Sequence, residues 1–125
     1  MSSNEFEKTA LIIDDSEINR DIITAYLEDE GYTIFSAADG IEGIEEFKAN
    51  KPFITFLDIV MPKMTGLVVL EKIKALDSKA IVVMVSSYVS KQNIQKAKDL
   101  KADWFLIKPF SRQKFLETLR KFEPK

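Results

Sequence analysis

Hydrophobic residues gather along this chain in short runs that alternate with amphipathic stretches. Runs of about four to eight apolar or β-branched residues predict buried strands, whereas apolar positions spaced by three or four predict helices. Strand and helix signals alternate five times, with short connections between them. The predicted strands cover residues 9–14, 32–37, 53–58, 80–85 and 104–107. This α/β alternation predicts a five-stranded parallel sheet, doubly wound as (βα)5 with helices on both faces.

The predicted helices begin at polar caps and carry apolar stripes. The expected caps are Ser16, Asp39 and Ser111. The apolar faces expected on the first two helices are Ile18, Ile22 and Tyr26 on one, and Ile41, Ile44 and Phe47 on the other. The helix over residues 90–100 has only Ile94 and Ala97 among several lysines, so we expect it to be weakly buried.

Hydrophobicity also suggests where the strands lie in the sheet. Residues 80–85 form the most hydrophobic run, which predicts a central strand, because central parallel strands are covered on both faces. Residues 32–37 are less hydrophobic and are expected near an edge. After the last predicted helix, residues 123–125 are expected to form a loose tail.

The length and residue inventory narrow the function. The 125 residues fit one domain, which we assign to residues 1–125 with a core over about 9–122. The chain has no cysteine and no histidine, which excludes thiolate zinc sites, imidazole bases and Ser-His-Asp triads. A metal would need oxygen ligands, which favours magnesium, manganese or calcium. These exclusions leave carboxylates, hydroxyls and lysines as the candidate reactive groups.

Charge and hydropathy argue against two other classes of protein. The net charge of -2 gives no electrostatic footprint for direct nucleic-acid binding. The first residues lack the pattern of a signal peptide, and no apolar run approaches the roughly 18 residues of a membrane helix. We therefore expect a cytoplasmic protein that does not enter a membrane.

Polar residues occur where the predicted buried strands end. The residues at these strand ends are Asp14, Asp15, Asp58, Ser86 and Lys108. The carboxyl ends of parallel strands meet at one edge of a sheet, so these side chains should converge there. Three crowded carboxylates need a cation, and oxygen ligation points to Mg2+. A cation, an ammonium and a hydroxyl around a carboxylate suit a phosphoryl group, with Asp58 as the nucleophile that forms an acyl phosphate.

In their order and spacing, these residues resemble those of a known family. The marks are the acidic pair Asp14-Asp15, Asp58 followed by Met61-Pro62 and Gly66, Ser86 after an apolar strand, and Lys108-Pro109-Phe110. Together they resemble the receiver domain of two-component response regulators, as in the single-domain chemotaxis regulator. The resemblance covers about residues 9–122 and implies the flavodoxin-like receiver fold. It also implies that a histidine kinase or phosphotransfer protein donates a phosphoryl group to Asp58.

The resemblance implies a role for each of the other site residues. Asp15, Asp58 and the main-chain carbonyl of Val60 would hold Mg2+, or Mn2+ in its place. Asp14 would act through a metal-bound water, and Ser86 and Lys108 would contact the phosphoryl oxygens. Such a domain catalyses only its own phosphorylation and dephosphorylation and is not otherwise an enzyme.

The resemblance further implies a switch. Phosphorylation would draw Ser86 inward and let Phe105, at the switch aromatic position, turn into the space it leaves. The changed surface of the last two helices and the last strand would then bind an output protein or domain. The domain would be a monomer or a phosphorylation-dependent dimer.

Two positions differ among receivers and tune the lifetime of the phosphoryl group. They are Val60 and Tyr88, two residues after Asp58 and Ser86 respectively. An apolar and a bulky aromatic side chain cannot readily orient an attacking water. We therefore expect slow self-dephosphorylation.

Three alternatives remain open at this point. A magnesium-dependent phosphatase with an aspartyl phosphate would place a second Asp at the position of Val60. A flavodoxin-like cofactor module would need a phosphate-cradling loop in place of Asp14-Asp15-Ser16-Glu17. A pseudo-receiver would bind partners without phosphorylation, which the complete acidic set argues against. No output motif follows Phe122, which favours a stand-alone regulator or phosphorelay intermediate over a transcription factor.

Overall fold

The computed structural model describes residues 6–88 and 90–124. Its strands are β1 (Thr9–Ile13), β2 (Thr33–Ala37), β3 (Ile54–Asp58), β4 (Ile81–Ser86) and β5 (Trp104–Ile107). Its helices are α1 (Glu17–Asp29), α2 (Gly40–Asn50), α3 (Gly66–Leu76), α4 (Lys91–Asp99) and α5 (Arg112–Phe122). The strands are all parallel, in the order β2-β1-β3-β4-β5. The predicted doubly wound five-stranded sheet is therefore confirmed.

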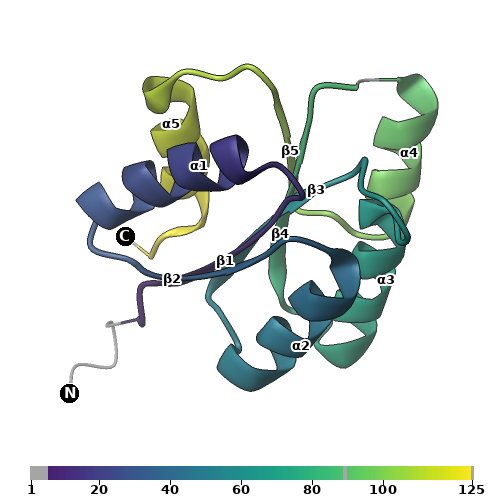
Figure 1. The fold of residues 1–125 in the computed structure, drawn as a ribbon, viewed down its shortest axis with the longest axis horizontal. Coiled ribbons are helices and arrows are strands. Elements are labelled where there is room, and N and C mark those ends of the chain that lie inside the picture. Colours follow the sequence, from purple (N-terminus) through teal and green to yellow (C-terminus); the bar gives the residue numbers. More distant parts are fainter. Residues whose placement is uncertain (1–5, 89, 125) are drawn as a thin grey trace.

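The helices form a layer on each face of the sheet. Figure 1 shows α1 and α5 on one face, and α2, α3 and α4 on the other. Each face has its own hydrophobic cluster, because alternate residues of every strand point to opposite sides. For example, Leu57 of β3 belongs to the α2–α4 side and Phe56 to the α1–α5 side. Both clusters thus hold β3 rigidly in place.

The middle strand is β3, so the prediction that residues 80–85 lie at the centre needs a correction. β4 lies between β3 and β5, one place from the edge. β2 is an edge strand, as its lower hydrophobicity predicted. Hydrophobicity indicates whether helices cover both faces of a strand, and the interior strands β1, β3 and β4 all satisfy that condition. It therefore separates interior from edge strands and does not order the interior ones.

Two predicted helix faces were partly wrong. Ile18 and Ile22 of α1 are 72% and 41% exposed, whereas the buried residues of this helix are Ile23 and Leu27. The helix carries two overlapping apolar stripes at a spacing of four, and packing against α5 and the sheet selects the second. On α2, Ile41 is 58% exposed, while the other two residues of the predicted stripe are buried. On α4, only Ala97 is buried, so the weak burial predicted there is confirmed.

The expected loose tail is also wrong for Glu123. Its carboxylate accepts a 2.6 Å hydrogen bond from the hydroxyl of Tyr32 and a 2.9 Å bond from Arg120. Arg120 in turn pairs with Glu30 at the end of α1. The end of α5 is therefore tied to the connection between α1 and β2. Lys125 lies outside the described residues.

The loop after β3 folds back tightly onto the strand. The amide of Gly66 donates a 2.8 Å hydrogen bond to the carbonyl of Ile59. A Cβ atom at Gly66 would lie only 2.0 Å from the carbonyl oxygen of Asp58, so no larger residue fits there. Glycine at this position therefore allows α3 to begin directly against the end of β3.

Candidate functional site

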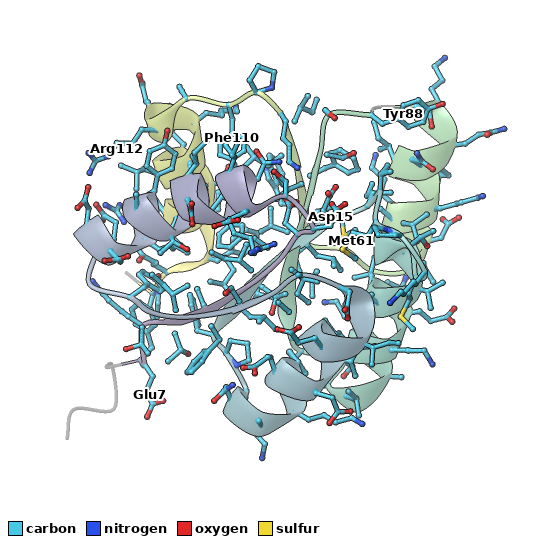
Figure 2. The ribbon with its side chains drawn as sticks, in the orientation of Figure 1. Glu7, Asp15, Met61, Tyr88, Phe110 and Arg112 are labelled. Carbon is cyan, nitrogen blue, oxygen red and sulfur yellow. The ribbon has the colours of Figure 1, made fainter. Side chains whose placement is uncertain are left out.

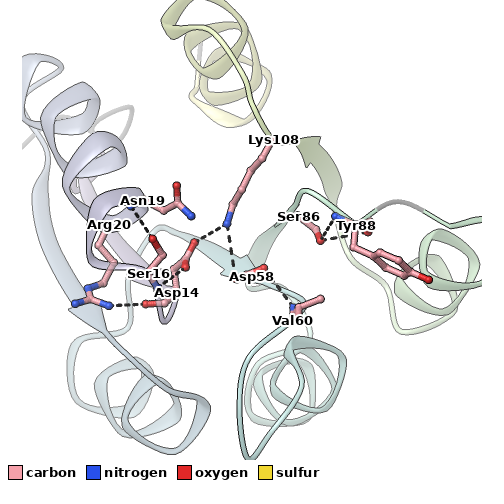
Figure 3. A network of polar contacts seen from close by, with 9 residues as sticks. All are labelled: Asp14, Ser16, Asn19, Arg20, Asp58, Val60, Ser86, Tyr88 and Lys108. Carbon is pink, nitrogen blue, oxygen red and sulfur yellow. Dashed lines mark hydrogen bonds and ion pairs between the residues drawn. The ribbon is translucent and has the colours of Figure 1, made fainter.

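The structure brings the polar strand ends together at the carboxyl edge of the sheet. Asp14 and Asp15 follow β1, Asp58 and Ser86 end β3 and β4, and Lys108 follows β5. Figure 3 shows Lys108 between Asp14 and Asp58, with Ser86 at the neighbouring strand end and its hydroxyl bonded to Tyr88, and Figure 2 shows Asp15 at the same edge. Residues separated by much of the chain thus form one site, because every strand runs in the same direction.

Three carboxylates crowd this site. Asp14, Asp15 and Asp58 each offer an oxygen, and these oxygens lie within 4.8 Å of one another. Asp14 and Asp58 are buried, at 2% and 6% exposure, while Asp15 is exposed. Carboxylates packed this closely repel one another unless a cation lies between them. Hard oxygen donors with one open side suit Mg2+, so the residues present fit a magnesium ion.

Every polar atom of Asp14 has a partner. Its amide donates to the carbonyl of Ala37, and its own carbonyl accepts a 2.7 Å bond from Arg20. One carboxylate oxygen accepts from the amide of Ser16 at 2.9 Å, and the other from Lys108 at 2.9 Å. Asp14 is therefore fixed in both backbone and side chain. Ser16 also caps α1 by accepting from the amide of Asn19, as predicted.

Lys108 supplies the positive charge within the site. Its ammonium lies 2.9 Å from Asp14 and 3.7 Å from Oδ2 of Asp58. The ion pairs are largely out of water, because the side chain of Lys108 is 14% exposed. One ammonium cannot balance three carboxylates, so the site retains negative charge that a divalent cation would neutralise.

Burial raises the pKa of Asp58 to about 6 from an ordinary value of 3.8. The second cause is the nearby charge of Asp14, while the charge of Lys108 and the amide of Val60 act in the opposite direction. That amide donates a 3.3 Å hydrogen bond to Oδ1 of Asp58. At neutral pH Asp58 is therefore mostly ionised, with a basicity above that of a surface carboxylate.

Ser86 and Tyr88 form a small turn after β4. Ser86 is 1% exposed, and its hydroxyl donates to the carbonyl of Tyr88 at 3.2 Å and accepts from the amide of Tyr88 at 3.1 Å. The side chains of Val60 and Tyr88 are exposed, at 58% and 62%. The two positions singled out in the sequence therefore lie open to solvent in the loops after β3 and β4.

Phe105 lies away from the strand ends, in β5. It is half-buried and packs against the hydrophobic cluster on the α2–α4 side of the sheet. It also lines a hollow of about 400 Å³ with residues of α4 and the chain that follows it, including Ile94, Ala97 and Trp104. A side chain beside a hollow has room to change its rotamer.

Comparison with known proteins shows which family has this arrangement. The family model described as the response regulator receiver domain matches residues 10–120. This chain belongs to the response regulator receiver family. The resemblance inferred from the sequence is confirmed, and the match spans the whole receiver fold from β1 to α5.

Individual receiver proteins are also similar to this chain. Chemotaxis protein CheY of Treponema pallidum is 38% identical over 112 residues, which cover 87% of this chain and 78% of the relative. Sporulation initiation phosphotransferase F of Bacillus subtilis is 29% identical over 91% of this chain and 92% of the relative. A crystal structure of a CheX-CheY-BeF3-Mg2+ complex from Borrelia burgdorferi matches with a TM-score of 0.89 and 33% identity, covering 94% of this chain and 90% of that one.

The receiver family defines the general function. Receiver domains are phosphoacceptor signalling switches of two-component systems, and they act between kinases and output targets. They bind Mg2+ at an acidic cluster, and Asp14, Asp15 and Asp58 form such a grouping here. This receiver is therefore a signalling domain and not an enzyme in the usual sense. Among residues 6–88 and 90–124, no helix has the length and hydropathy needed to cross a membrane.

The sequence patterns did not identify Arg20 as a site residue. Its guanidinium reaches back from α1 to the carbonyl of Asp14. Its position six residues after Asp14, in a helix that begins at a strand end, was the only available signal. Many surface arginines meet that condition, so only the contact itself distinguishes Arg20.

Proposed function

We propose that Asp58 accepts the phosphoryl group of this receiver. The observation that supports this most is that a buried carboxylate with a raised pKa lies 3.7 Å from a lysine ammonium and beside two further carboxylates. Of the three acids, Asp58 is the one that ends the central strand, so its position is held from both faces of the sheet. A nucleophile fixed in this way loses little freedom on reaction.

The same proposal gives the metal ligands. Asp15, Asp58 and the main-chain carbonyl of Val60 would hold Mg2+, or Mn2+ in its place, and Asp14 would act through a bound water. The grouping of the three carboxylates supports this assignment. A cation held by these residues would neutralise negative charge on the phosphoryl oxygens. These ligands around a cation would also repel one another less, which would remove the part of the raised Asp58 pKa that the charge of Asp14 adds to the larger effect of burial.

The proposed chemistry has two steps: transfer of a phosphoryl group to Asp58, and later hydrolysis of the acyl phosphate. An oxygen of Asp58 attacks the phosphorus of a phosphohistidine on the kinase or phosphotransfer protein. A P–O bond forms, the P–N bond breaks, and its electron pair stays on the imidazole nitrogen, which takes up a proton from solvent. Hydrolysis restores the Asp58 carboxylate: a water oxygen attacks phosphorus, the acyl phosphate P–O bond breaks with its electron pair left on Asp58, inorganic phosphate leaves, and the proton lost by the water goes to solvent.

Lys108 and Ser86 would hold the transferred group. Lys108 is already within 3.7 Å of Asp58, so its ammonium could exchange Asp14 for a phosphoryl oxygen with a small movement. The hydroxyl of Ser86 would have to leave its two bonds with Tyr88, which would rearrange the turn after β4. This exchange of partners is the first step of the proposed switch.

The second step would take place at Phe105 and α4. Rearrangement of Ser86 would let Phe105 turn inward, where its half-buried ring adjoins a hollow. The weak anchoring of α4, with Ala97 as its buried residue, means that little packing opposes such a shift. The surface formed by α4, β5 and α5 would then bind the output partner.

Intact-mass measurement tests the proposed function directly. Wild-type protein incubated with MgCl2 and acetyl phosphate should gain one phosphoryl group, and Asp58→Asn should gain none. Asp21→Asn, an exposed aspartate of α1, is the matched control and should be modified like the wild type. An adduct on Asp58→Asn would move the phosphoacceptor elsewhere. Absence of both the adduct and Mg2+ binding in wild-type protein would favour a pseudo-receiver instead.

A further inference from the structure

The guanidinium of Arg20 bonds to the main chain beside the acidic site. Its Nη1 atom donates a 2.7 Å hydrogen bond to the main-chain carbonyl of Asp14, a contact visible in Figure 3. The side chain is half-buried. Within residues 6–88 and 90–124, its guanidinium forms no ion pair with a carboxylate. Among the described residues, the contact of this guanidinium at the acidic site is therefore its hydrogen bond to the carbonyl oxygen of Asp14.

That oxygen belongs to the peptide unit that joins Asp14 to Asp15. β1 ends at Ile13, and the amide of Asp14 still pairs with β2 through the carbonyl of Ala37 at 3.1 Å. The carbonyl of Asp14 lies past the end of β1 and accepts its hydrogen bond from Arg20. Because a peptide unit is planar, fixing its oxygen also fixes the direction in which the backbone continues to Asp15.

Asp15 depends on this constraint more than the other two acids. Asp14 is held by Ser16 and Lys108, and Asp58 by the amide of Val60. Asp15 is exposed, and in the described part of the chain none of the side-chain hydrogen bonds ends on its carboxylate. Its placement near the other carboxylates therefore comes from its backbone alone.

We propose that Arg20 is a positioning residue for the metal site, which it serves by holding the Asp14–Asp15 peptide in place. The inference rests on the proposed function, because it assumes that Asp15 binds Mg2+. Arg20 touches neither the metal nor the phosphoryl group and acts only through the peptide. Its role resembles that of outer-shell hydrogen bonds, whose loss weakens metal binding although no ligand is removed.

The test is calorimetric titration with MgCl2 alone on wild type, Arg20→Met and Arg112→Met. Methionine keeps most of the apolar stem of arginine and removes the donors. Arg112 is the control because it is an exposed arginine of α5 whose ion pair, with Asp29 at 3.4 Å, lies on the helix surface. We expect Arg20→Met to bind Mg2+ about 10-fold more weakly and Arg112→Met to bind like wild type.

A second measurement separates positioning from general stability. The increase in Tm on adding a fixed concentration of MgCl2 should be smaller in Arg20→Met than in wild type, whatever the Tm without metal. A Mg2+ affinity within twofold of wild type, or an equal loss of Tm with and without Mg2+, would overturn the proposal.

The two proposals can fail separately. If wild-type protein binds Mg2+ and forms the adduct on Asp58 while Arg20→Met binds Mg2+ equally well, only the role of Arg20 is wrong. If wild-type protein itself binds no Mg2+, the proposed metal site is wrong and the positioning role fails with it.

Discussion

Lys108 and Asp14 form a 2.9 Å ion pair across 94 residues of sequence. The same ammonium lies 3.7 Å from Asp58, so it stands between the two buried carboxylates of the site. Asp14 also accepts from the amide of Ser16, which aims its other oxygen at Lys108. The ion pair thus places the lysine where a phosphoryl group on Asp58 would need a cation.

Removal of that ammonium should change how Asp58 titrates. The charge of Lys108 lowers the pKa of Asp58 against the larger effect of burial, so Lys108→Met should raise this pKa above about 6. NMR titration of the Asp58 carboxyl carbon in metal-free protein measures the change. Lys96→Met, at an exposed position of α4, is the control and should leave the pKa unchanged. An unchanged or lower pKa in Lys108→Met would contradict the prediction.

The charge of Asp58 should make the metal-free protein less stable as pH rises. Its pKa is about 6 when folded and near 3.8 when exposed, so the folded state holds more protons between these values. The free energy of unfolding therefore falls as pH increases through this window. Asp58→Asn removes this loss and should raise the free energy of unfolding by about 2 kcal/mol at pH 7.5, and by less at pH 5.

Urea unfolding in chelator at the two pH values measures this effect. Saturating MgCl2 provides the internal control, because it should stabilise wild type more than Asp58→Asn. If Asp58→Asn raises the free energy of unfolding equally at both pH values, the cause is a change in packing rather than the loss of the Asp58 charge. If Asp58→Asn does not raise the free energy of unfolding at pH 7.5, the ionised Asp58 does not destabilise the folded protein and the prediction is wrong.

The buried hydroxyl of Thr55, in the middle of β3, should also lower the free energy of unfolding. Thr55 is fully buried between Leu11 and Val82 in the sheet register, and its hydroxyl has no hydrogen-bond partner among the described residues. Thr55→Val keeps the shape and removes the unsatisfied group, so the free energy of unfolding should rise by about 1 kcal/mol.

Thr118 offers a matched control for that substitution. It is 1% exposed, and its hydroxyl donates a 3.0 Å bond to the carbonyl of Lys114. Thr118→Val removes a satisfied hydrogen bond and should give no gain in the same urea unfolding experiment. Equal effects of the two substitutions would mean that the hydroxyl of Thr55 is satisfied in solution.

The lifetime of the phosphoryl group should depend on Val60 and Tyr88. Both side chains are exposed, and neither ends in an amide or carboxylate that could orient a water attacking the phosphoryl group. Val60→Asn with Tyr88→Gln introduces amides that can orient that water, so the adduct should decay roughly 10-fold faster. Intact-mass time courses after removal of the phosphodonor measure the decay. Val68→Asn, at an exposed position of α3, is the control and should decay like wild type.

The alternation of strand and helix signals was sufficient to predict the fold. Each strand signal comes from local side-chain pattern, and right-handed crossovers leave little freedom once the elements are known. Local sequence also located the caps at Ser16, Asp39 and Ser111, because a cap bonds to residues only three positions away. The order of the interior strands was not predictable, since β3 and β4 are both covered on both faces.

The same division applies to helix faces and to the chain end. The exposure of Ile18 and Ile22 follows from where α5 and the sheet meet α1, which the spacing within α1 cannot reveal. The anchoring of Glu123 likewise depends on Tyr32, a residue 91 positions away. Both corrections concern contacts between elements, whose relative rotation is set by packing.

For the site, the strand patterns alone were enough to infer that acids, a hydroxyl and a lysine end four strands of one parallel sheet and therefore share an edge. The pairing of Lys108 with Asp14, the bonds of Ser86 within its own turn and the bond from Arg20 to the carbonyl of Asp14 became known only from the folded protein. The difference is one of range. Strand direction and hydrophobic pattern are local properties, whereas a hydrogen bond requires atoms from separate elements to meet within about 3 Å.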